Sequence, residues 1–160
     1  ENMRQNRGQM GAVLGPFEAI QLLRGMRTLF LRVRQSSQSA QQIAETLRSH
    51  NAISEVLYPG LPDFPGHDIA ARQMKDGFGG MLSIRLKAGE AAAIATAAHV
   101  QLWHRATSLG GVESLLEHRG SIEGAGSPVP LDLLRLSVGI EDPEDLISDL
   151  NDALNRATTK

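Results

Sequence analysis

The sequence predicts an α+β or α/β fold in which helices pack against one sheet of about four strands. Two observations lead to this prediction. Helical hydrophobic periodicity and strict alternation of apolar and polar residues follow one another along the chain, and clusters of glycine and proline separate most of these segments. The length of 160 residues is enough for one domain with its own hydrophobic core.

Helices are predicted in the first third of the chain. The first follows Gly15, because Pro16 suits a first helical turn, and Gly25 interrupts it. The second covers residues 29–47 and is the strongest structural prediction in the sequence. Its polar residues lie opposite one apolar stripe, which consists of Leu29, Val33, Ala40, Ile43, Ala44 and Leu47.

Short strands and helices alternate over the middle of the chain. Residues 53–57 predict a strand that ends at a Tyr-Pro-Gly turn, and a proline-rich loop follows. Residues 67–74 predict a short helix, and the alternation over residues 81–86 predicts a second strand. Residues 90–99 are rich in alanine, so we expect a helix there.

The last third of the chain predicts two further strands. Residues 100–103 and those that follow look extended, residues 112–118 suggest a short helix, and residues 120–130 suggest a loop. Alternation predicts a strand over residues 133–138. A final helix begins at Asp142, which can cap the free amides of a first turn that also contains proline and acidic residues.

Composition excludes several classes of function. The net charge of −2 gives no general attraction to nucleic acid or to an anionic membrane, and six aromatic residues are too few for base-stacking platforms. The absence of cysteine removes disulfides, thiolate metal sites and thiol nucleophiles. The five histidines are never four residues apart, so we expect no metal-binding helix and no metal site.

The ends of the chain and its most apolar run support two further expectations. The first residue is Glu1 and the opening residues lack a signal-peptide core, so we expect a chain cut from a longer one. The run over residues 91–100 is too short to span a bilayer, so we expect no membrane partner. Cytoplasm is the expected compartment.

Two segments suggest chemistry. In residues 107–115, a hydroxyl residue precedes a glycine pair, where a ligand can approach the backbone closely and free amides favour an anion. In residues 133–138, alternation places Arg135 and Ser137 on the face opposite the leucines. Arg135 is then either a solvated residue or a guanidinium directed at a carboxylate, which its planar fork binds through two hydrogen bonds. Spacing alone leaves both interpretations open.

The same two segments carry a family resemblance. SLGGVESLLEH followed by LLRLSVGIEDPEDLISDL closely resembles the C-terminal end of the Cys/Met-metabolism family of pyridoxal-phosphate enzymes. This family includes cystathionine γ-synthases, cystathionine β- and γ-lyases, methionine γ-lyases and sulfhydrylases. The blocks GAVLGPFEAIQLLRGMRTLFL, YPGL, GHDIAARQM and GGMLSI resemble further family segments in the same order, so the resemblance covers nearly the whole chain.

The resemblance implies a domain without its catalytic partner. Residues 1–160 would form one α+β domain with a mainly antiparallel sheet, the small C-terminal domain of the α/β PLP-transferase fold, and residues 1–28 would lead out of the missing N-terminal cofactor domain. Family members bind pyridoxal phosphate mainly through that domain, whose lysine lies in a Ser-x-Thr-Lys type motif. None of the three lysines (Lys75, Lys87 and Lys160) lies in such a motif. We therefore expect no catalytic and no cofactor-binding residue in this chain, and no activity from it alone.

The resemblance also implies a substrate-binding group. Arg135 would bind the α-carboxylate of an amino-acid substrate, with Ser108 beside it and Thr107 and Leu109 in the same group. Thr107 departs from the glutamate of several γ-synthases and γ-lyases and leaves the reaction type open. Leu109 is like the γ-type enzymes, whereas some β-lyases have tryptophan there.

The function expected from the resemblance is transsulfuration. The full-length enzyme would be a cystathionine γ-synthase or a cystathionine γ- or β-lyase, and it would form a homotetramer. The alternative is a non-catalytic α+β binding or assembly module in which Arg135 is a surface residue.

Overall fold

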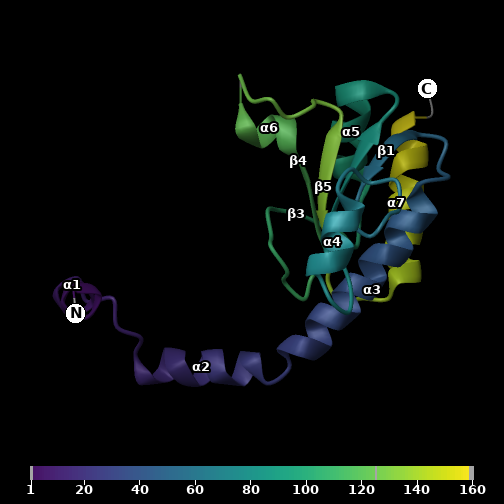
Figure 1. The fold of residues 1–160 in the computed structure, drawn as a ribbon. Coiled ribbons are helices and arrows are strands. Elements are labelled where there is room, and N and C mark those ends of the chain that lie inside the picture. Colours follow the sequence, from purple (N-terminus) through teal and green to yellow (C-terminus); the bar gives the residue numbers. More distant parts are fainter. Residues whose placement is uncertain (1, 125, 159–160) are drawn as a thin grey trace. The chain divides into compact units, whose positions relative to one another are not determined.

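The computed structural model describes residues 2–124 and 126–158 (Figure 1). The described chain divides into two compact units between Leu31 and Arg32. The first unit contains helices α1 (Asn2–Gln9) and α2 (Pro16–Met26), neither of which has a buried residue. As expected, α2 begins at a proline, but it continues through Gly25, and α1 was not expected from the polar opening of the chain.

The second unit is built on a five-stranded sheet, so the predicted α+β class is confirmed. The strand order is β1-β2-β5-β4-β3, and every neighbouring pair is antiparallel except β3 and β4. The strand beyond the expected four is β4, which lies in a segment expected to be helical. The strands are β1 (Ile53–Leu57), β2 (Met81–Leu86), β3 (His104–Arg105), β4 (Leu115–His118) and β5 (Leu133–Ser137).

Helices pack on one face of this sheet. Figure 1 shows α5 and α7 side by side, and α5 also contacts β2, β4 and β5. The expected cap of α7 is present, because the Asp142 carboxylate accepts a hydrogen bond from the backbone N–H of Glu144 at 2.8 Å. The helices of this unit are α3 (Leu29–Leu47), which begins in the first unit, α4 (His67–Gln73), α5 (Gly89–His99), α6 (Arg119–Glu123) and α7 (Pro143–Thr158).

The hydrophobic core lies between these helices and the sheet. It consists almost entirely of aliphatic side chains, as the low aromatic content requires. Trp103 is the largest buried side chain, and its indole N–H donates to the backbone oxygen of Leu146 in α7 at 3.1 Å. The sheet contributes Leu82, Ile84, Leu86, Leu116, Leu134 and Leu136, and the helices contribute chiefly Ile43, Leu47, Ala93, Leu146, Leu150 and Leu154.

One expected element has a different structure. Residues 112–118 do not form a short helix, since residues 115–118 form β4, paired with β5. Pairing with two neighbours overrides the weak helical spacing of so short a segment, because Leu116 then enters the core while Glu117 points to the other face. The expected loop over residues 120–130 begins within the short helix α6. Among the described residues, no helix has the length and apolar character needed to cross a membrane.

Candidate functional site

A row of polar residues crosses the sheet on the face opposite the core. Ser83 in β2, Arg135 in β5 and Glu117 in β4 are register partners across three neighbouring strands. We call the face that contains them the polar face; it also includes Arg85 and Ser137. The leucines on either side of Arg135 point into the core, as the alternation of β5 predicts.

Glu117 lies at the centre of the polar row. Its carboxylate Oε1 accepts hydrogen bonds from Nη1 of Arg135 at 3.0 Å and from Nη1 of Arg119 at 2.8 Å. Its Oε2 accepts a hydrogen bond from the hydroxyl of Thr107. The Glu117 side chain is 5% exposed, whereas those of Arg135 and Arg119 are 20% and 22% exposed. A buried carboxylate therefore holds two guanidiniums that still reach solvent.

The electrostatics of Glu117 match this geometry. Burial by itself raises the pKa of a carboxyl, because it disfavours the charged form. Here the hydrogen bonds from Thr107, Arg119 and Arg135 outweigh burial and hold the pKa of Glu117 below its ordinary value. Glu117 is therefore ionised at neutral pH.

The loop with Ser108 and Leu109 is attached to the same face. The N–H of Gly110 donates to the Ser137 hydroxyl at 3.3 Å, and Ser137 is two residues beyond Arg135 on the same side of β5. The φ of Gly110 is +103°, a conformation that favours glycine. Within the loop, the N–H of Gly111 donates to the Ser108 hydroxyl at 3.3 Å. The loop is thus attached to the polar face at two points. Thr107 is bonded to Glu117 in β4, and Gly110 is bonded to Ser137 in β5.

Ser114 attaches the other end of this loop. It is fully buried, and both its N–H and its hydroxyl donate to the Glu141 carboxylate, at 2.7 Å and 2.8 Å. The N–H of Gly139 in turn donates to the Ser114 hydroxyl at 2.8 Å. A Cβ at position 139 would lie 2.1 Å from the backbone oxygen of Val112, so only glycine allows the two segments to approach so closely.

The structure brings three of the four predicted substrate-binding residues together, and the side chain of the fourth is exposed. Thr107 and Arg135 share Glu117 as a partner, and Ser108 adjoins Thr107 in the attached loop. The side chain of Leu109 is 84% exposed. In the part of the chain that the structure describes, no hydrogen bond joins Ser108 to Arg135 directly.

Sequence reasoning missed Glu117, Arg119 and the acceptor role of Ser137. The signal for Glu117 was present in the sequence, because Leu-Leu-Glu-His has the alternation of a short strand. Interpreting residues 112–118 as a helix concealed it. The position of Arg119 depends on the turn into α6, for which no pattern was visible.

Two cavities differ in whether residues of the site line them. One, of about 380 Å³, has Thr107 and Glu117 in its wall, together with Arg105. Its remaining lining is mainly apolar and comes from α5, β4, α6 and the residue after β3: Ile94, Ala97, Ala106, Leu116, His118, Ser121 and Ile122. The apolar surface and the buried carboxylate thus meet beside the polar row.

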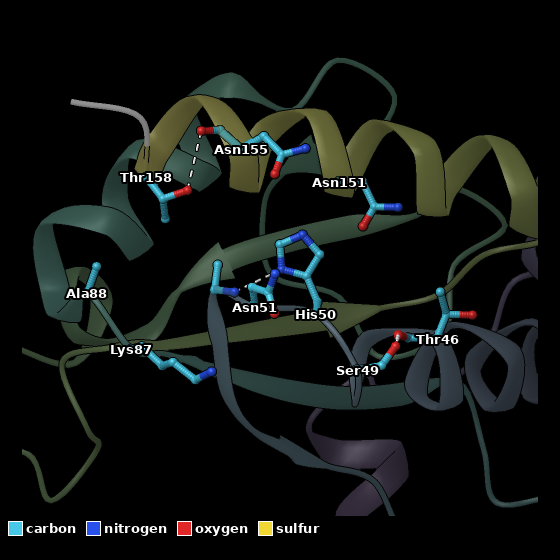
Figure 2. Close-up of a pocket in the computed structure, with 10 residues that line it drawn as sticks. Thr46, Ser49, His50, Asn51, Lys87, Ala88, Asn151, Asn155 and Thr158 are labelled. Atoms are coloured by element: carbon cyan, nitrogen blue, oxygen red, sulfur yellow. Dashed lines mark hydrogen bonds between the residues drawn. The ribbon is translucent and has the colours of Figure 1, made fainter.

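The second cavity, of about 540 Å³, contains none of the predicted site residues. Figure 2 shows the imidazole of His50 between Lys87 and the α7 residues Asn151 and Asn155. The Nδ1 of His50 accepts a hydrogen bond from the N–H of Ala52 at 3.2 Å. Burial, assisted by the positive charge of Lys87, lowers the pKa of His50. This histidine is therefore neutral at neutral pH.

Among the described residues, the polar row has neither a lysine partner nor a metal site. Of the two lysines that the structure describes, neither Lys75 nor Lys87 has a hydrogen bond or ion pair with Glu117, Arg119 or Arg135. Within residues 2–124 and 126–158, no group of three or more histidine, aspartate or glutamate side chains is arranged to hold a metal ion.

Comparison with known proteins identifies relatives. The family model for Cys/Met metabolism PLP-dependent enzymes matches residues 1–155. The chain is 53% identical over 149 residues to a cystathionine gamma-synthase of Mycobacterium tuberculosis, a match that covers 90% of this chain and 38% of the relative. It is 41% identical over 168 residues to the cystathionine gamma-lyase of Saccharomyces cerevisiae, covering 99% of this chain and 43% of the relative.

Solved structures show the same likeness. The crystal structure of metB from Corynebacterium glutamicum has a TM-score of 0.87 and 47% identity, over 94% of this chain and 40% of that one. Cystathionine gamma synthase from Xanthomonas oryzae pv. oryzae, solved with aminoacrylate and cysteine, has a TM-score of 0.82 and 45% identity, over 89% of this chain and 38% of that one. The chain therefore spans about two fifths of the length of its relatives. It belongs to the Cys/Met metabolism family of pyridoxal-phosphate-dependent enzymes.

Proposed function

We propose that this chain is the C-terminal domain of a longer transsulfuration enzyme, and that it binds the α-carboxylate of the amino-acid substrate through Arg135. The observation that supports this most strongly is the state of the Arg135 guanidinium. One of its nitrogens donates to Glu117, and its side chain still reaches solvent. A guanidinium has five N–H donors in a fixed fork, so the rest of the fork is available for a carboxylate.

The loop beside Arg135 completes the proposed site. Ser108 and the backbone around Gly110 lie in a segment joined to Ser137 on the polar face. We propose that the Ser108 side chain lies against the bound substrate, with Thr107 and Leu109 nearby. A fixed carboxylate orients the Cα–H bond of the substrate, so that the bond is already in the geometry needed for removal of its proton.

Pyridoxal phosphate would supply an electron sink for the negative charge that develops at Cα. The described residues of this chain do not fit as its covalent anchor, because neither of their two lysines interacts with the polar row. We propose that the cofactor is held mainly by a part of the protein outside this chain. The 160-residue chain alone is then inactive, and the full-length enzyme functions as a homotetramer in the cytoplasm.

The names of the relatives suggest the reaction class. They include cystathionine gamma-synthases, L-methionine gamma-lyases, a cystathionine gamma-lyase and a cystathionine beta-lyase. We propose that the full-length protein forms or cleaves a C–S bond of a sulfur-containing amino acid. Among these activities, Leu109 favours γ-elimination or γ-replacement.

The test is the Arg135→Ala variant of the full-length protein, assayed with cystathionine, methionine and O-succinylhomoserine. A charge-assisted contact to a carboxylate contributes roughly 1.5–3 kcal/mol, so KM should rise about 10- to 150-fold. Arg135→Lys should recover only part of the loss, because lysine lacks the planar fork. Arg85→Ala is a matched control on the same face, where Arg85 pairs with Asp132. An unchanged KM in Arg135→Ala would remove Arg135 from the site.

A further inference from the structure

We infer that Glu117 is a positioning residue for Arg135: it fixes one edge of the guanidinium so that the other edge faces the substrate carboxylate. This inference rests on the proposed function, because it assigns a role to Glu117 only if Arg135 binds that carboxylate. It also assigns Thr107 a task different from substrate contact, namely to hold Glu117 in place.

The strand register makes the Glu117–Arg135 contact possible. The two residues are directly opposite each other on the antiparallel strands β4 and β5. Side chains at such positions lie about 5 Å apart at Cβ, so a carboxylate and a guanidinium can meet without distortion. The observed Nη1–Oε1 distance is 3.0 Å. An arginine side chain otherwise loses rotamer entropy when it binds a ligand, and this contact removes part of that cost beforehand.

A carboxylate beside an anion-binding arginine also opposes substrate binding. It competes for the same guanidinium, and its negative charge repels the substrate carboxylate. The structure offsets this charge with Arg119, whose Nη1 lies 2.8 Å from the same Oε1. Two guanidiniums thus share one buried carboxylate. Arg119 is further paired with Glu123, four residues away on α6, at a more exposed position. Arg119 thus shares the negative charge of Glu117 with Arg135, so Arg135 does not neutralise that carboxylate alone.

Thr107 fixes the remaining oxygen of the carboxylate. Its hydroxyl donates to Oε2, while both arginines donate to Oε1. Because each oxygen has a partner, rotation of the carboxylate breaks at least one hydrogen bond. The orientation of Arg135 is in this way linked, through Glu117, to the loop that contains Ser108.

The experiment compares kcat and KM of the full-length holoenzyme with those of Glu117→Ala and Glu117→Gln. If Glu117 positions Arg135, Glu117→Ala should raise KM roughly tenfold with a smaller change in kcat. Glu117→Gln keeps an oxygen acceptor and should recover most of that loss, and it also serves as the variant that folds if alanine does not. A KM that falls in either variant would show that Glu117 competes with the substrate for Arg135, and would overturn the inference.

A double-mutant cycle separates this inference from the proposed function. Adding Glu117→Ala to Arg135→Ala should change KM no further, because the residue that Glu117 positions is already absent. If Arg135→Ala raises KM but Glu117→Ala does not, only the inference about Glu117 fails. If Arg135→Ala leaves KM unchanged, the proposed function fails. Glu55→Ala is the matched control, since Glu55 faces Arg85 across β1 and β2 in the same kind of cross-strand pair.

Discussion

The two faces of the sheet are stabilised by different interactions, although the same strands form both. On β5, Leu134 and Leu136 are fully buried among aliphatic neighbours, while Arg135 and Ser137 point to the polar face. The core face is stabilised by removal of apolar surface from water, which is non-directional. The polar face is held by hydrogen bonds between specified atoms, which are directional.

The polar face is nevertheless not simply solvated. Glu117 and Ser137 are buried, and each has a hydrogen-bond partner. In the described part of the chain, every buried side-chain nitrogen or oxygen is hydrogen-bonded. Arg135 is the residue of the polar row that combines a fixed contact with solvent access. A packed network that leaves a fixed guanidinium accessible to solvent is the arrangement that an anion-binding site needs.

The largest effect is expected on the core face. Leu136→Ala removes a fully buried side chain that pairs across the sheet with Leu82 and Leu116. It should lower the free energy of unfolding of the chain by about 2–5 kcal/mol, measured by urea denaturation. Leu109→Ala is the control, because Leu109 is 84% exposed and its loss should cost under about 0.5 kcal/mol. An equal loss of unfolding free energy in the two variants would contradict the burial of Leu136 and the exposure of Leu109.

A pH-dependent effect should arise from a polar group on the core side. Tyr58 is fully buried, and its hydroxyl donates to the backbone oxygens of Gly79 at 2.9 Å and Ser37 at 3.3 Å. Burial, with a smaller contribution from the charge of Glu45, raises the pKa of Tyr58 to about 12. The neutral form is favoured in the folded state, so stability is fully present below pH 10 and is lost as pH rises through 12.

This loss should amount to about 2–3 kcal/mol of unfolding free energy between pH 10 and 12. The measurement is urea denaturation across that range, with Tyr58→Phe as the control that lacks the titrating group. Tyr58 is the only tyrosine in the chain, so ultraviolet absorbance of its phenolate follows the ionisation directly. A midpoint near pH 10 in the folded chain would show that the hydroxyl is solvated, contrary to its position in the core.

Local patterns predicted the core face well. The C-terminal half of the apolar stripe of residues 29–47, the alternation of residues 81–86 and 133–138, and the cap at Asp142 all depend on neighbours in sequence, and the structure confirms them. Leu29 and Val33, in the first half of the predicted stripe, are instead 42% and 51% exposed. The position of Arg135 on the face opposite the leucines follows from the same local alternation. Such patterns suffice where an element is long enough for its period to be visible.

The partners of Arg135 depend on strand order, which no local pattern contains. Glu117 becomes its neighbour only because β4 pairs with β5, and β4 is a strand of four residues. Thr107 reaches the same carboxylate from a loop ten residues away in sequence. The arginine was therefore predictable from its own strand, whereas the network that holds it arises from contacts between distant segments.

The smallest of the expected effects tests whether the attached loop depends on Ser114. Ser114→Ala leaves the backbone N–H of Gly139 without its acceptor and removes one of two hydrogen bonds to Glu141. Unfolding free energy should fall by about 1–3 kcal/mol, less than for Leu136→Ala, because the variant leaves a buried polar group unpaired but little empty space. Ser54→Ala is the control, since the exposed Ser54 hydroxyl bonds only to a backbone oxygen across β1 and β2. In the full-length enzyme, Ser114→Ala should also raise KM, because the loop that it fixes contains Ser108. A variant that loses stability without any change in KM would limit Ser114 to folding and would separate the loop from the polar face.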